Sequence, residues 1–387
     1  MSYITRTAEQ TLVQMLQTPK VGIILGARQV GKTTLIKQIL GQKKTTFLNL
    51  DLEIDKQRLL AASTLSPNDA IRALGQPDVL VIDEAQVLPA TSKIVKGWYD
   101  ARLPLKVFLL GSSSLDLADQ SVESLAGRNE KLMLPPLLFQ EILSNQPWYS
   151  DVFTSEHILT HFYDPLQTLL MSCLSLGQYP EAVTTPTPAD YIRNLASDYL
   201  WKDTLQLGQV RNPDLIRRLL MLLAYQIGSE VSVNELANNL NMARETVNRY
   251  LDLLEQTFII FRLPAFSTNP RKEINKNHKI YFWDMGIRNA LLNSLDTNPL
   301  RPDIGDLWEN WVIAEFAKQN LLTGQQKTLY FWRSHSQSEV DLVIQSGTQL
   351  RAIEIKWNKQ KLSNRAFTTR YGVDVEIINN KNPFVSL

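Results

Sequence analysis

The chain has 387 residues, a formal net charge of +1 and a single cysteine, Cys173. This length predicts two or three domains. The near-neutral charge excludes a molecule that is basic as a whole, so any nucleic-acid surface must be a local patch. One cysteine excludes an internal disulfide and a cysteine-cluster metal site. No apolar run reaches the ~18 residues of a membrane span, and Met1 to Glu9 lack a signal-peptide core. We therefore expect a cytoplasmic protein with no membrane partner.

Strand-like runs alternate with longer helical segments in the first third of the chain. The runs lie near Val21, Phe47, Val79, Val107 and Lys131. Such alternation predicts an α/β domain in which a parallel sheet carries helices on both faces. We expect this domain to span residues 1–136.

The first run, Val21 to Leu25, leads into the pattern G-x-x-x-x-G-K-[ST] and then into a helix-compatible stretch. The glycines of this pattern let backbone N–H groups curl around phosphates, the lysine reaches the β and γ oxygens, and the hydroxyl binds Mg²⁺ at a helix N-terminus. The pattern therefore predicts a nucleotide and Mg²⁺ as ligands, with Lys32 also acting in catalysis and Thr33 on the metal. The predicted nucleotide-binding residues are Gly26, Ala27, Arg28, Gln29, Val30, Gly31, Lys32, Thr33 and Thr34.

Two acidic residues, Asp83 and Glu84, end the apolar run that begins at Val79. After a phosphate loop, one acid at such a strand end can hold the Mg²⁺ shell and the next can polarise the attacking water. We assign Asp83 to the metal and Glu84 to the water. The alternative is a solvated turn without a chemical role.

Two further positions are candidates for catalysis. The run Leu105 to Leu110 ends in serines, and Ser112 or Ser113 could present a hydroxyl to the γ-phosphate or the water, unless the serines form a plain turn. Arg128 could stabilise transition-state charge in its own subunit or in that of a neighbour, or it is an ordinary surface arginine. Action on a neighbour would require a homo-oligomer.

A mainly helical region follows, over residues 137–210, with breaks at Tyr179-Pro180 and in the proline-threonine stretch 184–188. Residues 211–290 then show the layout of a winged helix-turn-helix. Two short helices, the first capped by Ser232, precede a β-rich tail. This module either binds DNA or serves packing and oligomerisation. The candidate groove and wing-tip contacts are Arg244, Asn248, Arg249, Arg271 and Lys272.

The last region, residues 291–387, carries an acidic pattern. Glu309 lies in a predicted amphipathic helix, 305–319, and Asp341 lies in a predicted strand. Glu354 and Lys356 share one face of the next strand because side chains alternate, and a turn at Gly347 would bring Asp341 to Glu354. Such a set would hold one or two Mg²⁺ ions and orient water against a phosphodiester. The alternative is a buried ion-pair network.

With these motifs in place, the chain resembles a widespread bacterial and archaeal group of predicted AAA-type ATPases with a C-terminal domain of unknown function related to the PD-(D/E)xK nucleases. The resemblance covers almost the whole chain. The matching stretches are Gly26 to Thr34, Val79 to Gln86, Leu110 to Ser114, Ser124 to Arg128, Gly177 to Glu181, Lys279 to Asp284, Glu309-Asn310, Glu339 to Asp341 and Ile353 to Lys356.

The resemblance implies ATP as the nucleotide and a fixed order of parts: P-loop ATPase core, helical lid, winged helix-turn-helix and an α/β restriction-endonuclease-like domain. One departure is that Gly177-Gln178 stands where the group shows two glycines. We expect a Mg²⁺-dependent ATPase that couples its nucleotide state to the C-terminal parts and acts on a partner such as DNA. Two alternatives remain: an ATP-gated, Mg²⁺-dependent DNase, and a nucleotide-dependent protein-binding scaffold.

Overall fold

The computed structural model describes residues 3–112, 125–198, 213–267, 278–334, 338–358 and 365–386. Packing divides the chain into two compact units. The N-terminal unit comprises Thr5–Pro135 with Gln256–Phe258. The C-terminal unit comprises Met1–Ile4, Pro136–Glu255 and Ile259–Leu387. The finer division into four domains remains a prediction.

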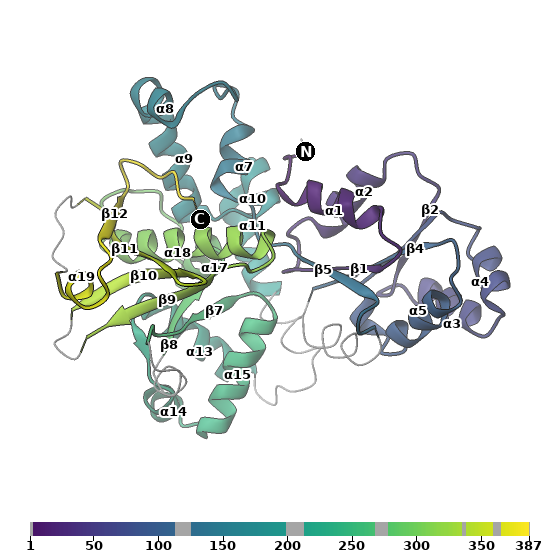
Figure 1. Ribbon diagram of the computed structural model, residues 1–387. Helices are drawn as coiled ribbons and strands as arrows, with labels where there is room; N and C mark the ends of the chain where they lie inside the picture. Colours follow the sequence, from purple (N-terminus) through teal and green to yellow (C-terminus); the bar gives the residue numbers. More distant parts are fainter. Residues whose placement is uncertain are drawn as a thin grey trace. The chain divides into compact units, whose positions relative to one another are not determined.

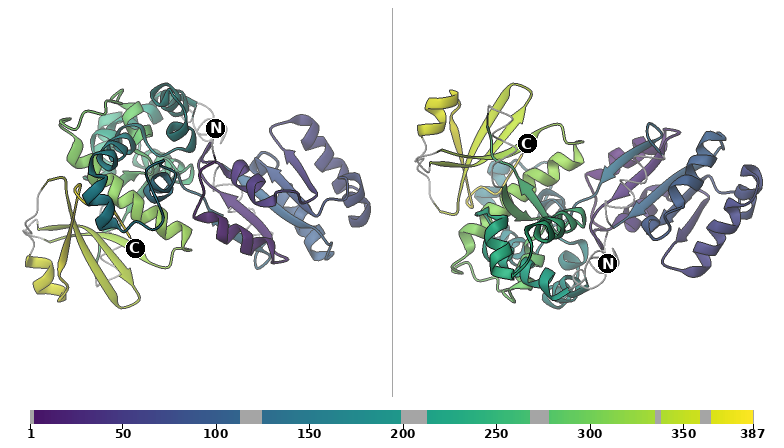
Figure 2. Two further views of the ribbon diagram at one scale, coloured as in Figure 1. Left: turned by 90° about the horizontal axis from the view of Figure 1, so that it is seen from above. Right: turned by 90° about the horizontal axis from the view of Figure 1, so that it is seen from below.

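A five-stranded parallel sheet forms the centre of the N-terminal unit, in the order β2-β3-β4-β1-β5. Its strands are β1 (Val21–Leu25), β2 (Thr45–Asn49), β3 (Val79–Asp83), β4 (Lys106–Gly111) and β5 (Asn129–Met133). Figures 1 and 2 show helices on both faces of the sheet. These are α1 (Ala8–Leu16), α2 (Lys32–Leu40), α3 (Glu53–Ser63), α4 (Pro67–Ala73) and α5 (Thr91–Asp100), with a short 3-10 helix, η1 (Ala85–Val87), after β3. The predicted α/β fold with a parallel sheet is confirmed.

Strand β1 lies between β4 and β5, and all of its residues are buried. A continuous apolar run is what a parallel strand needs when helices cover both faces. Because neighbouring strands run in the same direction, the carboxyl ends of β1, β3 and β4 meet at one edge of the sheet. Functional groups that follow these strands are thereby brought together.

Helices begin the C-terminal unit. They are α7 (Phe139–Ser144), α8 (Ser155–His161), α9 (Tyr163–Leu176), α10 (Pro180–Thr184) and α11 (Pro188–Asp198). The predicted breaks fall between helices, because Pro180 and Pro188 each occupy the first position of a new helix, where a missing N–H is not needed. Helix α17 (Met285–Leu291) packs against α9 and α11.

A three-stranded antiparallel sheet with three helices follows. Its elements are α13 (Pro213–Tyr225), β6 (Glu230–Val231), α14 (Val233–Leu240), α15 (Arg244–Gln256), β7 (Ile260–Leu263) and β8 (His278–Phe282), with strand order β6-β8-β7. The predicted cap is present, since the Ser232 hydroxyl accepts the Glu235 N–H at 3.4 Å. Asn241 has a left-handed backbone, φ 51°, and ends α14, and α15 begins at Arg244.

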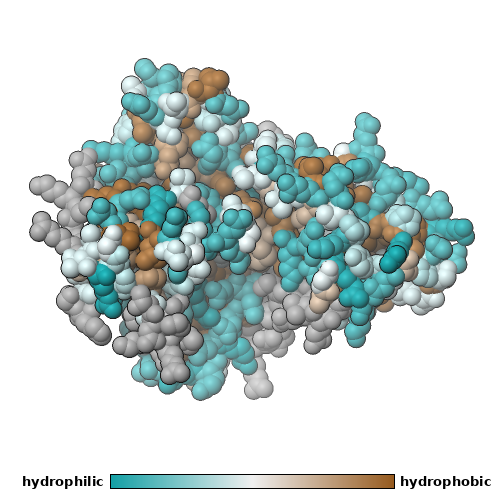
Figure 3. Space-filling view, in the orientation of Figure 1, coloured by the Kyte–Doolittle hydropathy of each residue, from teal (hydrophilic) through white to brown (hydrophobic). Residues whose placement is uncertain are grey.

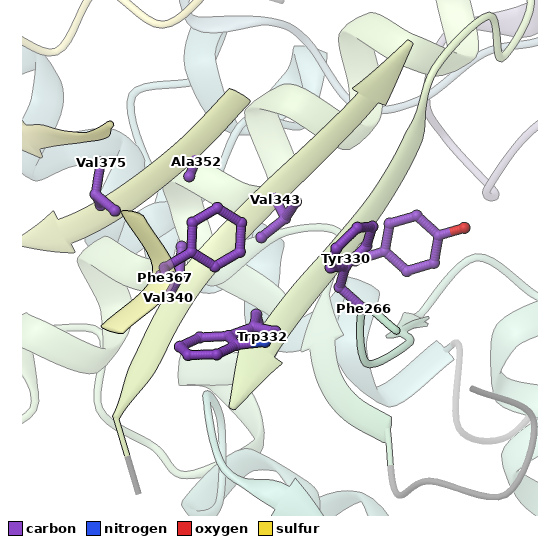
Figure 4. Packing of buried hydrophobic residues seen from close by; sticks show 8 residues of the cluster. All are labelled: Phe266, Tyr330, Trp332, Val340, Val343, Ala352, Phe367 and Val375. Atoms are coloured by element: carbon purple, nitrogen blue, oxygen red, sulfur yellow. The ribbon is translucent and has the colours of Figure 1, made fainter. Parts of the chain in front are cut away.

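A four-stranded mixed sheet completes the C-terminal unit, in the order β12-β11-β10-β9. Its elements are α18 (Ile304–Leu322), β9 (Thr328–Arg333), β10 (Glu339–Ser346), β11 (Gln349–Lys356), α19 (Arg365–Tyr371) and β12 (Val375–Asn379). The pairs β9–β10 and β10–β11 are antiparallel, whereas β11–β12 is parallel. Figure 4 shows buried apolar side chains gathered against this sheet, among them Trp332, Val343 and Phe367.

Helix α18 differs from the predicted amphipathic helix. Its side chains are buried around most of the circumference, including Trp308, Trp311 and the charged pair Glu315 and Lys318. The reason is that α18 packs against β8, β11, α9 and α17 at once. A helix enclosed in this way needs no solvent face.

Among the residues that the structure describes, no helix is both long and apolar enough to cross a bilayer. Figure 3 shows hydrophilic side chains over most of the visible face, with smaller hydrophobic areas between them.

Candidate functional site

The phosphate loop leaves the end of β1 and enters α2. A Cβ on Gly26 would lie 2.2 Å from the carbonyl oxygen of Leu134, so only glycine fits where the loop passes the backbone that follows β5. Gly31 precedes α2 with φ 94°, a left-handed conformation that glycine adopts without strain. Ala27 and Val30 are fully buried, so these two residues offer a ligand their backbone atoms only.

Lys32 extends back over the loop from the first turn of α2. Its ammonium donates to the carbonyl oxygens of Gly26 and Ala27, each at 2.9 Å. The side chain is almost buried, with 6 % of the residue exposed. Its charge is therefore held within the loop, as phosphate recognition requires.

Thr33 and Asp83 meet across the sheet edge. The Thr33 hydroxyl donates to Asp83 Oδ2 at 2.6 Å, and Asp83 Oδ1 accepts the Glu84 N–H at 3.0 Å. Although β1 and β3 are separated by β4, their carboxyl ends lie at the same edge. A hydroxyl and a carboxylate are oxygen ligands of the kind that Mg²⁺ prefers, so this pair fits the metal that the sequence predicted.

Glu84 is held in place by two neighbours. Its Oε2 accepts from Gln86 Nε2 at 2.5 Å and from the Ser112 hydroxyl at 3.3 Å, and Gln86 Nε2 also donates to Ser112 Oγ at 3.1 Å. Ser112 is nearly buried at the end of β4. The structure therefore brings the predicted serine to the predicted glutamate. Ser113 lies outside the described residues.

Gln86 escaped the sequence reasoning. It is in a matching stretch, two residues after Glu84, but an amide carries no charge that would single it out. The left-handed backbone of Glu84, φ 51°, and the 3-10 turn that follows bring the Gln86 side chain to the glutamate. A strained residue at a strand end is a typical feature of functional sites.

The remaining loop residues lie at its outer side. Arg28 forms an ion pair with Asp51 at 3.7 Å, while Gln29, with φ 60°, and Thr34 are exposed.

Arg128 lies at the end of β1 that is far from the phosphate loop of its own subunit. Arg128 immediately precedes β5, and its carbonyl accepts the N–H of Val21 at the start of β1. The phosphate loop follows the other end of β1, about 15 Å away at 3.3 Å per residue. The Arg128 guanidinium instead pairs with Asp100 at 2.7 Å. A role in a neighbouring copy remains a prediction.

A buried arginine, Arg6, contacts the phosphate loop, although the sequence analysis assigned it no role. Its guanidinium donates to the carbonyl oxygen of Val30 at 3.0 Å and to that of Pro135 at 2.7 Å. The side chain is 5 % exposed. Arg6 therefore fixes the loop backbone to Pro135, where the first segment of the N-terminal unit ends and the chain continues into the C-terminal unit. Nothing local marks it, because its partners lie 24 and 129 residues away.

The predicted groove contacts share the outer face of α15. Arg244, Asn248 and Arg249 are exposed, whereas Val247 and Tyr250 are buried. This part of the chain thus presents two arginines and an amide away from its core. The predicted wing-tip residues Arg271 and Lys272 lie outside the described residues.

The predicted acidic set of the last region is brought together at one end of the β10–β11 hairpin. Lys356 Nζ lies 3.4 Å from Asp341 Oδ2 and 3.6 Å from Glu354 Oε1. Asp341 Oδ2 also accepts the Ile355 N–H at 2.6 Å. The predicted hairpin with its turn at Gly347, φ 58°, is confirmed.

Glu309 joins this set through other partners. Its Oε1 accepts from Lys279 Nζ at 3.2 Å and from the Tyr281 hydroxyl at 2.7 Å, both on β8. Lys279 and Tyr281 were part of a matching stretch, but no sequence pattern placed β8 beside the acids. We call Lys279, Tyr281, Glu309, Glu339, Asp341, Glu354 and Lys356 the C-terminal charge cluster.

Burial changes the acid–base behaviour of this cluster. Burial, and to a lesser extent the nearby Glu309 carboxylate, raise the pKa of Asp341 to about 7, although Lys356 acts in the opposite direction. Burial alone would lower the pKa of Lys279, but Glu309 and Glu339 outweigh it and hold the pKa of this lysine above its ordinary value. Lys279 is therefore cationic at neutral pH.

The departure at Gly177-Gln178 is accommodated without strain on the glutamine. The left-handed backbone of this turn belongs to Gly177, φ 81°, where a Cβ would lie 2.1 Å from Asp284 Oδ1. The Gln178 N–H donates to Asp284 Oδ2 at 2.6 Å, and its side chain bonds to Glu315 and Lys318. The second glycine of the group is therefore not required for this turn.

Comparisons with known proteins agree with the phosphate loop. Residues 18–143 match the family model described as "AAA domain". Residues 167–298 and 304–380 match two models described as "Domain of unknown function", DUF8612 and DUF4143. The AAA match and the loop geometry support an AAA-type P-loop ATPase domain that binds ATP.

Similar chains occur in bacteria and archaea. An uncharacterized protein of Mycobacterium tuberculosis is 29 % identical over 359 residues, which cover 91 % of this chain and 73 % of that protein. An uncharacterized protein of Methanocaldococcus jannaschii is 26 % identical over 338 residues, which cover 84 % of this chain and 72 % of that protein. Among solved structures, a Walker-type ATPase of Pyrococcus abyssi aligns with a TM-score of 0.48 and 17 % identity, over 75 % of this chain and 96 % of that one.

Proposed function

We propose that the protein is a Mg²⁺-dependent ATPase whose catalytic residues lie at the carboxyl edge of the N-terminal sheet. The observation that carries this proposal is the convergence of Thr33 with Asp83, and of Glu84 with Ser112, at the strand ends beside the phosphate loop. Lys32 adds the positive charge that the phosphates need. These are the groups that phosphoryl transfer to water requires.

Each residue has a separate task in this proposal. Backbone N–H groups of the loop and the Lys32 ammonium bind the β- and γ-phosphates. When bound through Thr33 and Asp83, Mg²⁺ would neutralise charge on those phosphates. The Glu84 carboxylate accepts a hydrogen bond from the attacking water and orients it towards the γ-phosphorus. Gln86 and Ser112 both donate to Glu84 and fix its direction.

The Glu84→Gln variant tests this assignment. Removal of the general base should lower phosphate release by about 10²–10⁴-fold and leave ATP affinity close to that of the wild type, because Glu84 does not hold the phosphates. Lys32→Ala should lose ATP binding itself. Glu53→Gln, which changes an exposed glutamate on α3 in the same way, is the matched control and should behave as wild type. Hydrolysis by Glu84→Gln at the wild-type rate would refute the proposal.

We propose further that nucleotide binding is coupled to the C-terminal unit through Arg6. Its bonds to Val30 and Pro135 connect the loop to the point where the chain leaves the N-terminal unit. The next segment is firmly held, because the Leu137 carbonyl accepts from Lys318 and the Phe139 N–H donates to Glu315. A shift of the loop would therefore be passed to Pro135 and onward along the chain.

We propose that residues 211–290 form a winged helix-turn-helix whose α15 meets DNA. The element order and antiparallel sheet support this fold, and the exposed Arg244, Asn248 and Arg249 support the surface. If both arginines contact phosphates, replacing them by alanine should weaken DNA binding. The slope of the logarithm of the binding constant against the logarithm of the salt concentration should then become shallower by about two. Replacing the exposed Arg58 and Arg72 of the N-terminal unit is the control. If the protein forms no complex with DNA, or a DNA complex that salt does not weaken, the result favours the protein-binding scaffold.

We propose a nuclease-like fold for residues 291–387. The order of helix α18, the antiparallel strands β9 to β11, helix α19 and the parallel strand β12 supports it, as does the approach of Lys356 to Asp341 and Glu354. An ATP-gated DNase would cleave DNA with added Mg²⁺, and Asp341→Asn and Lys32→Ala would both abolish cleavage. Cleavage unchanged in Asp341→Asn would exclude this cluster as its source.

A further inference from the structure

Lys279 is a buried cation among acids from two other elements. Only 2 % of the residue is exposed. Its ammonium lies 3.2 Å from Glu309 Oε1 on α18 and also forms an ion pair with Glu339 on β10. Tyr281, two residues along β8 and on the same face of the strand, donates to the same Glu309 oxygen.

Main-chain bonds bring β8 to this position. The segment after β7 is bonded to β9, since the Phe331 N–H donates to the Pro264 carbonyl at 3.0 Å and the Phe266 N–H donates to the Phe331 carbonyl at 2.6 Å. The Lys279 ammonium lies 5.5 Å from the centre of the Phe331 ring. The two sheets of the C-terminal unit are thus joined beside the cluster, and the position of Lys279 is fixed by the fold.

Protein donors already serve the carboxylates that a metal would need. Glu309 Oε1 accepts from Lys279 and Tyr281, and Asp341 Oδ2 accepts from Ile355 and Lys356. Divalent cations of this kind take oxygen ligands within about 2.0–2.6 Å, and a site without substrate phosphates must draw more of these oxygens from the protein. In the described parts of the chain, no group of three His, Cys, Asp or Glu side chains is arranged to hold a metal ion. The cluster, as folded, does not fit the metal implied by a nuclease-like domain.

We infer that Lys279 is the resident cation of the Glu309–Glu339–Asp341 cluster and takes the place that a divalent metal would occupy. Its ion pairs with Glu309 and Glu339 also fasten β8 to α18 and β10. Removing the ammonium while keeping the carboxylates would leave negative charges in a buried site. We therefore expect these carboxylates to rearrange around a divalent cation that is bound in its place. This inference is independent of the proposed ATPase, because it concerns residues of the C-terminal unit only.

Binding of Mn²⁺, measured by electron paramagnetic resonance on nucleotide-free full-length protein, tests the inference. An Asp83→Asn background removes the metal position beside the phosphate loop. In this background we expect no Mn²⁺ bound at the cluster. Adding Lys279→Met, which keeps the length of the side chain and removes its charge, should create one Mn²⁺ site. Adding Asp341→Asn to that variant should weaken Mn²⁺ binding at least tenfold.

Two outcomes would overturn the inference. The first is a Mn²⁺ site in the protein that retains Lys279, if Asp341→Asn abolishes it, because the metal would then bind beside the lysine. The second is a folded Lys279→Met protein that binds no Mn²⁺. If Lys279→Met does not fold, Lys279→Gln retains a hydrogen-bond donor without the charge and replaces it. ATP binding is measured separately, on the wild type and on Lys279→Met with Asp83 intact. A failure of the ATPase proposal is thereby distinguished from a failure of this inference.

Discussion

A methyl group added to Gly26 tests whether the phosphate loop depends on its close approach to the backbone at Leu134. In Gly26→Ala the new Cβ would lie 2.2 Å from the Leu134 carbonyl oxygen and 3.3 Å from a Val30 methyl carbon. Neither neighbour yields easily. The Leu134 N–H is bonded to the Leu25 carbonyl at 2.7 Å, and the Gly26 N–H to the Gly111 carbonyl at 3.3 Å. The loop backbone must therefore move.

The size of the movement follows from ordinary contact distances. A carbon and an oxygen that are not bonded to each other stay at least about 3 Å apart, so the loop must shift by nearly 1 Å. Overpacking of this kind costs about 1–3 kcal/mol of stability. Displacing positioned groups by about 1 Å can cost on the order of 10²-fold in function. We expect ATP affinity to fall by about that factor.

Gly97→Ala is the matched control. Gly97 lies inside α5 in the same unit, and a Cβ there would meet nothing within 4 Å. Because alanine favours a helix more than glycine does, this variant should be stabilised by about 0.5–1 kcal/mol and should bind ATP as the wild type does. Affinity is measured by isothermal titration with a non-hydrolysable ATP analogue, and stability by urea unfolding.

Wild-type ATP affinity in a folded Gly26→Ala protein would contradict this prediction, because the loop would then tolerate a shift of nearly 1 Å without loss of binding. Equal loss of affinity in both glycine variants would instead trace the effect to general destabilisation of the unit. Only a loss confined to Gly26→Ala supports the importance of the contact with Leu134.

Three other variants probe other parts of the molecule. Arg6→Met removes two bonds from a charged donor, each worth about 1.5–3 kcal/mol, so we expect a loss of about 3 kcal/mol in urea unfolding and weaker ATP binding; unchanged stability would argue against the bridge. Ser112→Ala removes one donor to Glu84 and should lower the hydrolysis rate about tenfold at unchanged ATP affinity; an unchanged rate would leave Ser112 as a turn residue. Because the pKa of Asp341 is raised to about 7, its stabilising contribution is complete below the unfolded pKa of about 4 and is lost as pH rises through 7. Wild-type stability relative to Asp341→Asn should therefore fall over this range, by at most about 1.4 kcal/mol per pH unit, and a difference that does not vary with pH would contradict this.

Patterns within single elements were predictable from the sequence. A continuous apolar run such as Val21 to Leu25 indicates a buried parallel strand, and the glycine and lysine spacing after it indicates the loop. The meeting of Thr33 with Asp83 also follows, because parallel strands end at the same edge. The hairpin that joins Asp341 to Glu354 follows from two alternating runs and a turn at Gly347.

Contacts between distant segments were not predictable. Arg6 reaches Pro135, and Lys279 reaches Glu309 and Glu339, through packing that no local period records. The amphipathic interpretation of α18 failed for the same reason, since several neighbours enclose that helix. Periodicity reports which residues of an element avoid water, but it does not report how many neighbours that element has.

The position of Arg128 shows that strand direction determines which residues can reach the phosphate loop. In a parallel sheet all amino ends lie at one edge and all carboxyl ends at the other, and ligands bind outside the carboxyl ends. Glu84 and Ser112 follow their strands, whereas Arg128 precedes β5 and pairs with Asp100 at the opposite edge. A β-strand of five residues spans about 16 Å, which exceeds the reach of an arginine side chain. Position relative to the strand is therefore a stronger criterion for a role in this site than residue type. For Arg128 it leaves a surface arginine paired with Asp100, or a role in a neighbouring copy, which stays a prediction.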